Sequence, residues 1–575
     1  METVTYKELK RLAKANQQPI KRLAVVGDCA TQQLAVALSG ESMRRDFPLA
    51  VYDADYDQLE ALLLDGDSEL YAFHPDYILI VCCTQKLQLR FEDTPLSERE
   101  TFAERELERF CGLWTRIAAN SSAKIIMFDF PEPDDSVFGS FGYRTPISFA
   151  YQCRKLNMLL GEAMAREYPN AYPAALSRIQ RQLGSSEFAD ARMWYLAKMS
   201  MQTETLPYAA ELVLDIVLAT QGRIKKCVIT DLDNTLWGGV IGDDGIDGIQ
   251  LGELGTGPAF SALQRYLKAL RERGILLAVC SKNHEETAKE PFLHHPDMVL
   301  RMEDIAIFVA NWENKAQNIR YIQETLNIGM DSLVFLDDNP FERNLVKGLL
   351  PEGTVPELPE DPALVPEFLE GLHLFEAAGY SDEDSGRTAQ YRAEANRRAV
   401  QSTYADYDAY LTALEMRAAI MPFDSFHYAR IAQLTQRSNQ FNLRTIRYTE
   451  SEIEALAANP MYVTRYMTLS DRFGDHGLIS VVILKKQEDA MFIDTWLMSC
   501  RVLRRGVEQC LFDAIVALTL EQGYTRLRAE YLPTAKNKMV EHFYDECGMT
   551  PIGDGQYELD CTGYPMHQTK ITQEI

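Results

Sequence analysis

The sequence predicts an α/β protein of several domains, with two parallel sheets followed by a region richer in antiparallel strands. Three observations support this prediction. The chain has 575 residues, more than one hydrophobic core usually organises, since about 150 residues per domain is typical. Short apolar runs alternate with charged amphipathic stretches through most of the chain, as in strands joined by helices. The last part instead carries a hairpin pattern, in which two apolar runs flank a polar turn.

Three apolar runs predict the strands of a first α/β domain, assigned to residues 1–205. Each run is short, continuous and bounded by polar residues or glycine, as expected of strands buried on both faces of a parallel sheet. The charged stretch 96–118 is predicted to form an amphipathic helix. The predicted strands are 22–27, 77–83 and 124–130.

The same alternation restarts at Lys225 and predicts a second parallel sheet within residues 222–370. A connector rich in proline and acidic residues is expected at 351–366. The predicted strands are 227–230, 275–280 and 332–336, and the predicted helices lie near 259–273 and 315–326.

The third region, residues 380–575, is predicted to begin with a charged helical segment at 382–415 and to continue with more strands. Within it, the apolar runs 477–484 and 491–498 flank a polar turn at 486–489. This arrangement predicts a β-hairpin.

Composition excludes several classes of function. Acidic residues outnumber basic ones 84 to 58, which gives a net charge of −26. Nucleic-acid binding needs a concentrated basic surface, and an acidic surface repels anionic membranes, so we expect neither partner. The N-terminal segment lacks the apolar core of a signal peptide, and no apolar run reaches the roughly 18 residues of a membrane span. Eleven cysteines without a CxxC pair predict reduced thiols in a cytoplasmic protein and no structural zinc.

The most informative segment is 228–245, in which an apolar strand runs directly into Asp231, Asp233 and Thr235. The carboxyl ends of parallel strands meet at one edge of a sheet, and reactive groups collect there. Two further strands of this domain end in polar residues, and one helix begins with a lysine. The residues brought to the same edge are Ser281, Lys315, Asp337 and Asp338.

Four carboxylates at one edge repel one another unless a cation or protons intervene. Oxygen ligands of this kind suit Mg²⁺, so the sequence predicts a magnesium site. With the cation in place, one carboxylate can attack a phosphoryl group whose anionic oxygens the metal and Lys315 neutralise. We therefore predict phosphoryl-transfer chemistry.

The order Asp-x-Asp-x-Thr, Ser, Lys, Asp-Asp resembles the signature of the haloacid-dehalogenase-like (HAD) phosphotransferases. The resemblance implies a HAD-like Rossmannoid domain in which Asp231 is the nucleophile and forms an aspartyl-phosphate. It also implies that Asp233 is the general acid and base. Ser281 and Lys315 are then expected to hold the transferring phosphoryl group, and Thr235 to orient the first loop.

The same resemblance implies that Mg²⁺ is bound by Asp231, the backbone carbonyl of Asp233, and Asp337, with support from Asp338. The link between the first motif and the next predicted helix is short and rich in glycine, which leaves no room for a helical cap. An uncapped site admits a bulky or protein-borne substrate but excludes water poorly.

The wider stretch 192–543 resembles the FkbH-like proteins, the HAD subfamily IIIC phosphatase-like group. The resemblance implies that the protein takes D-1,3-bisphosphoglycerate, removes phosphate and loads the glyceryl unit onto the phosphopantetheine thiol of an acyl carrier protein in polyketide-type biosynthesis. Two alternatives stay open: a Mg²⁺-dependent phosphatase of another phosphorylated metabolite without acyl transfer, and a non-catalytic biosynthetic scaffold. The strings that carry the resemblance are DLDNTLWGGVIGDDG, LLAVCSKN, HPDMVLR, FLDDNPFERN, QLTQRSNQFNLRT, DRFGDHG, LMSCRVLRRGVE and YLPTAKN.

The C-terminal region resembles a GNAT-type acyltransferase, an α+β fold. Its turn at 501–507 would present backbone N–H groups and a helix N-terminus to a pyrophosphate or pantetheine arm. The candidate residues for binding this cofactor or carrier are Arg501, Arg504, Arg505 and Gly506. Arg504 stands where relatives tend to carry glycine, which argues against close backbone approach but lets Arg504 and Arg505 contact a phosphate through their side chains.

Glyceryl transfer through a covalent thioester would need a cysteine, and two are candidates. A symmetric hairpin would place Cys500 opposite Asp475 and beside His476, which could lower the pKa of the thiol and make it a nucleophile. A buried cysteine at a strand end is the alternative. Cys280 directly precedes Ser281, so its side chain is expected to point away from the serine.

The first domain resembles the SGNH-type hydrolases, because Gly27, Asp28 and Cys29 follow a strand as the Gly-Asp-Ser opening does there. The hydrolytic site is incomplete, since Cys29 replaces the serine and the Asp-x-x-His expected near Asp190 is absent. A cysteine without its histidine lacks a general base. We therefore expect a non-hydrolytic domain that covers the HAD site or docks a carrier protein.

Overall fold

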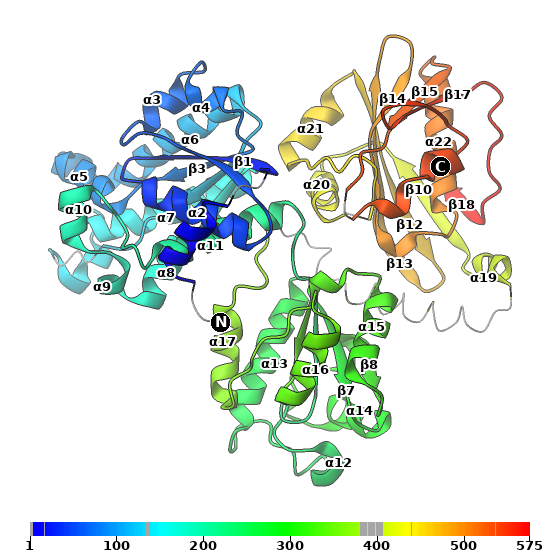
Figure 1. Cartoon of the computed structure of the whole chain (residues 1–575), viewed down its shortest axis with the longest axis horizontal. Coiled ribbons are helices and arrows are strands. Elements are labelled where there is room, and N and C mark those ends of the chain that lie inside the picture. Colours follow the sequence, from blue (N-terminus) through cyan, green and yellow to red (C-terminus); the bar gives the residue numbers. More distant parts are fainter. Residues whose placement is uncertain are drawn as a thin grey trace. The chain divides into compact units, whose positions relative to one another are not determined.

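The structure, a computed structural model, describes residues 4–15, 18–133, 137–379, 388, 391, 397, 406–438, 440–534 and 536–574 (Figure 1). The chain divides into two compact units, Met1–Ala219 and Thr220–Ile575. The finer division expected from the sequence, with domains at 1–205, 222–370 and 380–575, stays a prediction. Among the described residues, no helix combines the length and the apolar character needed to cross a bilayer.

The first unit contains a parallel five-stranded sheet in the order β2-β1-β3-β4-β5, with helices around it (Figure 1). The three predicted strands are confirmed as β1, β3 and β4, although β3 and β4 each end two residues early. The remaining two strands were not predicted, because β2 is only half buried and β5 is short and contains Pro173. The strands are β1 (Lys21–Gly27), β2 (Leu49–Asp53), β3 (Tyr77–Val81), β4 (Lys124–Phe128) and β5 (Ala171–Ala174).

Helices α3 to α7 bury apolar residues in one cluster with the strands of the sheet. The predicted helix at 96–118 is confirmed as a short 3₁₀ turn that leads into α6, whose Phe110 and Trp114 are buried against the sheet. The helices are α1 (Tyr6–Leu12), α2 (Gln32–Arg44), α3 (Leu59–Leu64), α4 (Glu69–Ala72), α5 (Thr84–Asp93), α6 (Phe102–Asn120), α7 (Phe149–Arg166), α8 (Leu176–Leu183), α9 (Ser185–Phe188), α10 (Ala191–Ala197) and α11 (Leu206–Thr220).

The second unit begins with a parallel four-stranded sheet in the order β8-β7-β6-β9. Successive residues of β6 face opposite sides, so that Val228 packs on the α13 side and Cys227 and Ile229 pack on the α15 side. The three predicted strands are confirmed, and β8 is an additional one. The strands are β6 (Cys227–Thr230), β7 (Leu276–Ser281), β8 (Ile305–Ala310) and β9 (Leu333–Leu336), and the helices are α12 (Ile241–Asp244), α13 (Gly257–Glu272), α14 (Glu285–His294), α15 (Lys315–Leu326), α16 (Pro340–Leu349) and α17 (Val365–Gly371).

Side-chain caps fix where the two helices nearest the site begin. Asn314 accepts a hydrogen bond from the N–H of Ala316, so α15 begins at Lys315. Asn339 accepts one from the N–H of Phe341, and Pro340 occupies the first turn of α16. These caps hold Lys315 and the residues after β9 in fixed positions.

The rest of the second unit is a mixed nine-stranded sheet, in the order β16-β17-β15-β14-β13-β12-β10-β18 with β11 paired to β14. Trp496 of β14 stacks on Phe512 of α22 in its core. Most of the helical segment predicted at 382–415 lies outside the described residues. The strands are β10 (Met416–Met421), β11 (Phe441–Asn442), β12 (Tyr462–Asp471), β13 (Gly474–Lys486), β14 (Met491–Met498), β15 (Arg526–Glu530), β16 (Thr550–Gly553), β17 (Gln556–Asp560) and β18 (Ile571–Glu574), and the helices are α19 (Tyr407–Ala413), α20 (Tyr428–Arg437), α21 (Glu450–Ala458), α22 (Val507–Glu521) and α23 (Phe543–Glu546).

The predicted hairpin is confirmed as β13 and β14, but its predicted register was wrong. Ser480 pairs with Met498, and a bulge interrupts the ladder near Ile483. The chain then leaves the sheet, so Cys500 begins a short 3₁₀ turn, and Asp475 pairs with β12 instead. Cys500 therefore does not face Asp475 across the hairpin, because the turn is centred one residue later than predicted and the bulge adds one further residue of shift.

Candidate active site

Three carboxylates lie together at the carboxyl edge of the four-stranded sheet. Asp231 follows β6, and Asp337 and Asp338 follow β9; one oxygen from each lies within 4.8 Å of the others. The parallel pairing of β6 with β9 aligns the ends of the two strands, and the N–H of Asp231 donates to the carbonyl of Leu336 at 2.9 Å. Asp231 and Asp337 are buried whereas Asp338 is exposed, so the group has one side open to solvent.

Lys315 bridges two of these carboxylates. Its Nζ lies 2.8 Å from Oδ2 of Asp231 and 2.6 Å from Oδ2 of Asp337, and the side chain is 3% exposed. Burial alone would lower the pKa of Lys315, but the two carboxylates outweigh it and raise that pKa above its usual value. The ammonium group therefore stays charged and offsets part of the negative charge.

One ammonium group does not balance three carboxylates. Burial, and then repulsion from Asp231, raise the pKa of Asp337 to about 6 despite Lys315. Burial and the same repulsion raise the pKa of Asp338. Oδ1 of Asp231 is buried and has no hydrogen-bond partner among the described residues. An unpartnered anionic oxygen within a set of oxygen donors fits a hard divalent cation at this position.

Asp233 is held apart from this group by three hydrogen bonds. Its Oδ1 accepts from Nε1 of Trp237 and from the N–H of Ile241, both at 3.0 Å. Its Oδ2 accepts from Nδ2 of Asn283 at 2.8 Å. These donors fix the carboxylate in one orientation, as a group that must give and take a proton at one point requires.

Two predicted hydroxyl residues lie at the same edge. Ser281 ends β7, is buried, and lies 3.4 Å from Nδ2 of Asn283. Oγ1 of Thr235 accepts from the N–H of Asp338 at 3.2 Å and donates to its carboxylate at 3.4 Å. Thr235 thus connects the loop after β6 to the loop after β9, consistent with the orienting role expected for it.

Three further residues of the site were not predicted from the sequence. Asn283 and Trp237 orient Asp233, and buried Arg343 donates to the backbone carbonyls of Asp337 at 2.8 Å and Asp338 at 2.6 Å. The signal for Asn283 was its spacing, since residues two apart at a strand end point to the same side. Arg343 lies near the start of α16, and its sequence distance from Asp337 gave no sign that the two residues are in contact.

Cys280 is placed where the sequence predicted, on the opposite face from Ser281. Its side chain is fully buried in the apolar cluster beneath α15, and its Sγ lies 3.8 Å from the carbonyl of Lys315. Burial raises the pKa of this thiol to about 12. A protonated, enclosed thiol has little nucleophilic character.

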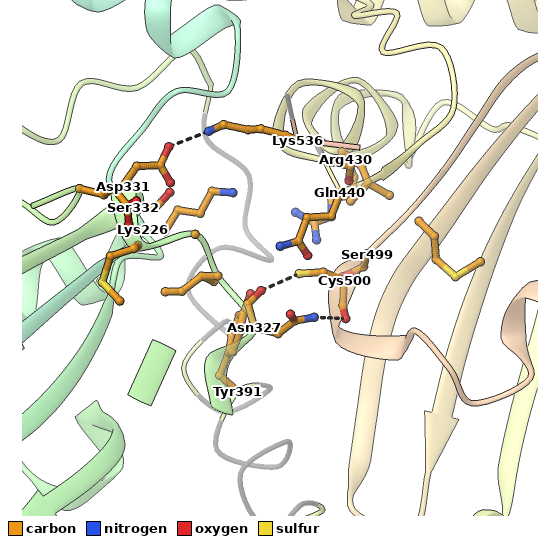
Figure 2. Close-up of a pocket in the computed structure, with 17 residues that line it drawn as sticks. Lys226, Asn327, Asp331, Ser332, Tyr391, Arg430, Gln440, Ser499, Cys500 and Lys536 are labelled. Carbon is orange, nitrogen blue, oxygen red and sulfur yellow. Dashed lines mark hydrogen bonds and ion pairs between the residues drawn. The ribbon is translucent and has the colours of Figure 1, made fainter. Parts of the chain in front are cut away.

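Cys500 lines a cavity of about 350 Å³ in the second unit (Figure 2). Its Sγ donates to the carbonyl of Asn327 at 3.3 Å, and Nδ2 of Asn327 donates to the carbonyl of Cys500 at 2.8 Å. Lys226, which precedes β6, also lines the cavity, whereas Asp231 follows β6. At about 3.3 Å per residue these two ends are about 16 Å apart. The structure therefore does not bring Cys500 to the carboxylates.

His476 is likewise not brought to Cys500 by the hairpin. Its Nε2 lies 3.1 Å from Oδ2 of Asp471, with both side chains buried, and Nε of Arg397 lies 2.6 Å from the same carboxylate oxygen. Nη1 of Arg505 lies 3.9 Å from it as well. Arg505 is therefore directed toward a buried carboxylate of the protein itself.

The turn before α22 has a backbone conformation suited to anion binding, but its anion is a carboxylate of the protein and not a phosphate. Arg504 and Gly506 have φ of +64° and +81°, so Arg504 adopts the left-handed conformation that usually favours glycine. The carboxylate of Glu508 accepts the N–H of Arg504 at 2.6 Å. Arg504 is exposed, and the side chain of Arg501 lies outside the described residues. The Glu508 carboxylate thus accepts one of the backbone N–H groups that were expected to bind a phosphate.

The structure of the first unit agrees with the prediction that its hydrolase site is incomplete. Cys29 follows β1, and its Sγ lies 3.5 Å from Oγ of Ser200. The only histidine in the sequence before residue 220, His74, precedes β3 and so belongs to the opposite edge of the sheet. Asp190 caps α10 by accepting the N–H of Arg192 at 2.8 Å. A Cys-His-Asp arrangement is therefore not formed.

Solved structures and a family model match this chain. The family model of the FkbH N-terminal domain matches residues 22–218. A crystal structure of the N-terminal part of the protein BF1531 from Bacteroides fragilis, containing a phosphatase domain complexed with Mg, is 44% identical with a TM-score of 0.63; the match covers 66% of this chain and 100% of that chain.

N-acetyltransferases match a smaller share of the chain. The ribosomal-protein-S18-alanine N-acetyltransferase from Escherichia coli is 14% identical with a TM-score of 0.20, and the match covers 25% of this chain and 94% of that chain. The spermidine N-acetyltransferase from Vibrio cholerae is 13% identical with a TM-score of 0.21, covering 26% and 98%. A search of curated proteins found no match. With a 44% identical relative matched over its whole length and the FkbH model on its first unit, the chain belongs to the FkbH family and carries a HAD-like phosphatase domain.

Proposed function

We propose that this protein is a Mg²⁺-dependent phosphatase and phosphotransferase of the HAD type. The observation that carries the proposal is the bridge from Lys315 to Asp231 and Asp337, beside an oxygen of Asp231 that is buried without a partner. Lys315 fixes the orientation of the Asp231 carboxylate, and the unpartnered oxygen is the one available to the cation. The relative BF1531, whose phosphatase domain was crystallised with Mg, supports the choice of cation.

Four residues perform the phosphoryl transfer in this proposal. Asp231 attacks phosphorus, the bond from phosphorus to the leaving oxygen breaks, and Asp233 gives that oxygen its proton. Water then attacks the aspartyl-phosphate, Asp233 takes a proton from the water, and the bond between Asp231 and phosphorus breaks. Ser281 and Lys315 hold the phosphoryl oxygens during both steps.

The acidic residues would hold the cation. Asp231, Asp337 and Asp338 offer oxygens within reach of one another, and the backbone carbonyl of Asp233 is the further ligand expected from the family. When bound, Mg²⁺ neutralises charge on the phosphoryl oxygens.

For the substrate, we propose D-1,3-bisphosphoglycerate, with glyceryl transfer to the phosphopantetheine thiol of an acyl carrier protein. Family membership supports this choice. Attack by Asp231 on the phosphate at C1 would release a carboxylate and lose the activated acyl group. We therefore propose that a thiol attacks the C1 carbonyl and expels the phosphate there. Asp231 then removes the second phosphate, which is an ester at C3.

The other regions take supporting roles in this proposal. The N-terminal domain at 1–205 is non-hydrolytic and docks the carrier protein, and the GNAT-like domain at 380–575 takes part in acyl transfer. Arg504, whose side chain is exposed, is the candidate contact with an acidic carrier. Cys500 stays a candidate thiol for a separate transfer step, because its cavity lies away from Asp231.

The test is the mass of a carrier protein after incubation with bisphosphoglycerate, Mg²⁺ and the enzyme. The proposal expects a gain of one glyceryl unit with wild type and of one phosphoglyceryl unit with Asp231→Asn. Phosphate release without any adduct would support the alternative, a phosphatase of another metabolite. A carrier that gains glyceryl and not phosphoglyceryl with Asp231→Asn, at the wild-type rate, would contradict the role of Asp231 on which both enzymatic accounts rest.

A further inference from the structure

A second group of potential ligands lies in the first unit, at the carboxyl ends of β1 and β3. Asp28 and Cys29 follow β1 and Cys83 follows β3, and one carboxylate oxygen and the two Sγ atoms lie within 4.8 Å of one another. The parallel pairing that sets Gly27 beside Val81 brings the three residues to one edge of the sheet. All three are buried.

Asp28 supplies an independent sign that a ligand belongs here. Its Oδ1 accepts the N–H of Cys83 at 2.9 Å, which fixes the carboxylate in position. Its Oδ2 is buried and has no hydrogen-bond partner within the described part of the chain. The residue is 4% exposed, so water does not readily replace that partner. A buried carboxylate oxygen in this state is destabilising unless a cation or a proton satisfies it.

The surroundings suit a divalent cation with thiolate ligands. Burial raises the pKa of Asp28, and contact with Cys29 followed by burial raises the pKa of the Cys83 thiol. Arg90 and Lys86 lie close enough to lower the pKa of Asp28, and their charges would offset the net negative charge of one divalent ion with three anionic ligands.

We propose that Asp28, Cys29 and Cys83 form a site for a thiophilic divalent cation, with Zn²⁺ as the ion that fits best. Zinc takes sulfur and carboxylate ligands in a tetrahedral arrangement whose ligand atoms lie about 3.5–4 Å apart, and the three atoms here lie within 4.8 Å of one another. Binding releases the two thiol protons and leaves the fourth position for another ligand. Ser200 and Cys83 both line a cavity of about 160 Å³, by which that ligand can reach the ion.

The experiment uses the full-length protein, stripped of metal by a chelator and kept reduced. One sample is incubated with Zn²⁺, and the zinc retained after gel filtration is measured by elemental analysis. Co²⁺ is titrated into a second, metal-free sample as a spectroscopic probe. Thiolate ligation gives an intense sulfur-to-cobalt charge-transfer band, which cobalt bound at the all-oxygen site of the second unit cannot give. Wild type is expected to retain one equivalent of zinc and to show the band.

Matched variants locate the site. Cys29→Ala and Cys83→Ala are expected to lose the band and the retained zinc. Cys82→Ala serves as the control, because Cys82 belongs to the apolar cluster on the α6 side of the sheet, and it is expected to keep both. Asp28→Asn keeps both thiols and is expected to weaken zinc binding at least tenfold, which covers the case in which a cysteine variant fails to fold.

Two results would overturn the proposal. One is reduced wild-type protein that retains no zinc and shows no band. The other is a Cys29–Cys83 disulfide found by mass spectrometry in protein isolated without reductant, together with no metal binding after reduction, which would assign the pair to redox chemistry. Neither result touches phosphate release by Asp231, so the proposed function is tested separately.

Discussion

Nζ of Lys315 lies 2.6 Å from Oδ2 of Asp337, and both side chains are almost completely enclosed by the protein. The pair joins the start of α15 to the end of β9, and through Asp231 it also reaches the end of β6. Three elements that are far apart in the sequence thus meet at one ammonium group. The ion pairs of Lys315 therefore connect the three strand and helix ends that form the site.

Replacing Lys315 by methionine should lower kcat for phosphate release by about 10²–10³-fold, because a preorganised positive group at the phosphoryl oxygens is lost. The matched control is Lys282→Met, since Lys282 pairs with Glu342 at 2.6 Å outside the carboxylate group. Steady-state phosphate release measures both. Equal losses in the two variants would show that general charge, and not the Lys315 bridge, matters.

Stabilisation by Mg²⁺ should grow with pH around 6. The pKa of Asp337 is raised to about 6 in the folded protein without metal. Protonation of Asp337 therefore stabilises the fold at a pH below the ordinary pKa of a carboxyl group. This stabilisation is lost as the pH rises through 6. Mg²⁺ relieves the repulsion that then appears. The increase in Tm on adding Mg²⁺ should therefore be larger at pH 7.5 than at pH 5.5.

Asp337→Asn is the control for this pH dependence, because it removes the titrating carboxyl and keeps its shape. The increase in Tm with Mg²⁺ should become small and similar at both pH values. A wild-type protein whose response to Mg²⁺ is identical at pH 5.5 and 7.5 would contradict the assignment of Asp337 as a ligand.

Asn283→Ala should lower kcat by about 10-fold with little change in KM, because Asn283 orients Asp233 and does not itself react. The acid limb of the pH profile of kcat should also move, which loss of stability alone would not cause. Asn327→Ala is a suitable control, since Asn327 bonds to Cys500 at the other edge of the sheet. An unchanged pH profile in Asn283→Ala would argue against a positioning role.

Cys500→Ala should leave phosphate release within about twofold of wild type, since Cys500 and Lys226 line one cavity and Lys226 lies at the opposite end of β6 from Asp231. The measurement compares phosphate release with carrier loading in the same sample. Loss of loading alone would assign Cys500 to acyl transfer. A large fall in phosphate release would show that the cavity of Cys500 and the carboxylates act together.

Much of this site follows from local sequence rules. The strand β6 and the helix α15 begin and end where apolar periodicity and the polar flanking residues predicted, because parallel strands buried on both faces leave a strong signal. The strand β8, with the run IAIFVA, carries the same signal and was predictable by the same rule. The carboxyl ends of β6, β7 and β9 then bring Asp231, Ser281 and Asp337 to one edge.

Other features depend on long-range geometry that local rules do not contain. The turn between β13 and β14 is centred one residue later than predicted, and a bulge near Ile483 adds to the shift, so Cys500 does not face Asp475. Cys29 and Cys83 are far apart in sequence, so the spacing rules that detect zinc sites pass over them. Arg505 was expected to reach a ligand, but its guanidinium group lies near the buried carboxylate of Asp471.

The link between β6 and α13 contains no helix other than the four-residue α12, so the HAD-like domain builds no lid of its own over Asp231. Any acyl phosphate that waited there would meet bulk water and hydrolyse to the free acid. If bisphosphoglycerate is the substrate, as proposed, that exposure sets the order of events: a thiol captures the acyl group first, and the durable phosphate ester is left for the open carboxylates to remove.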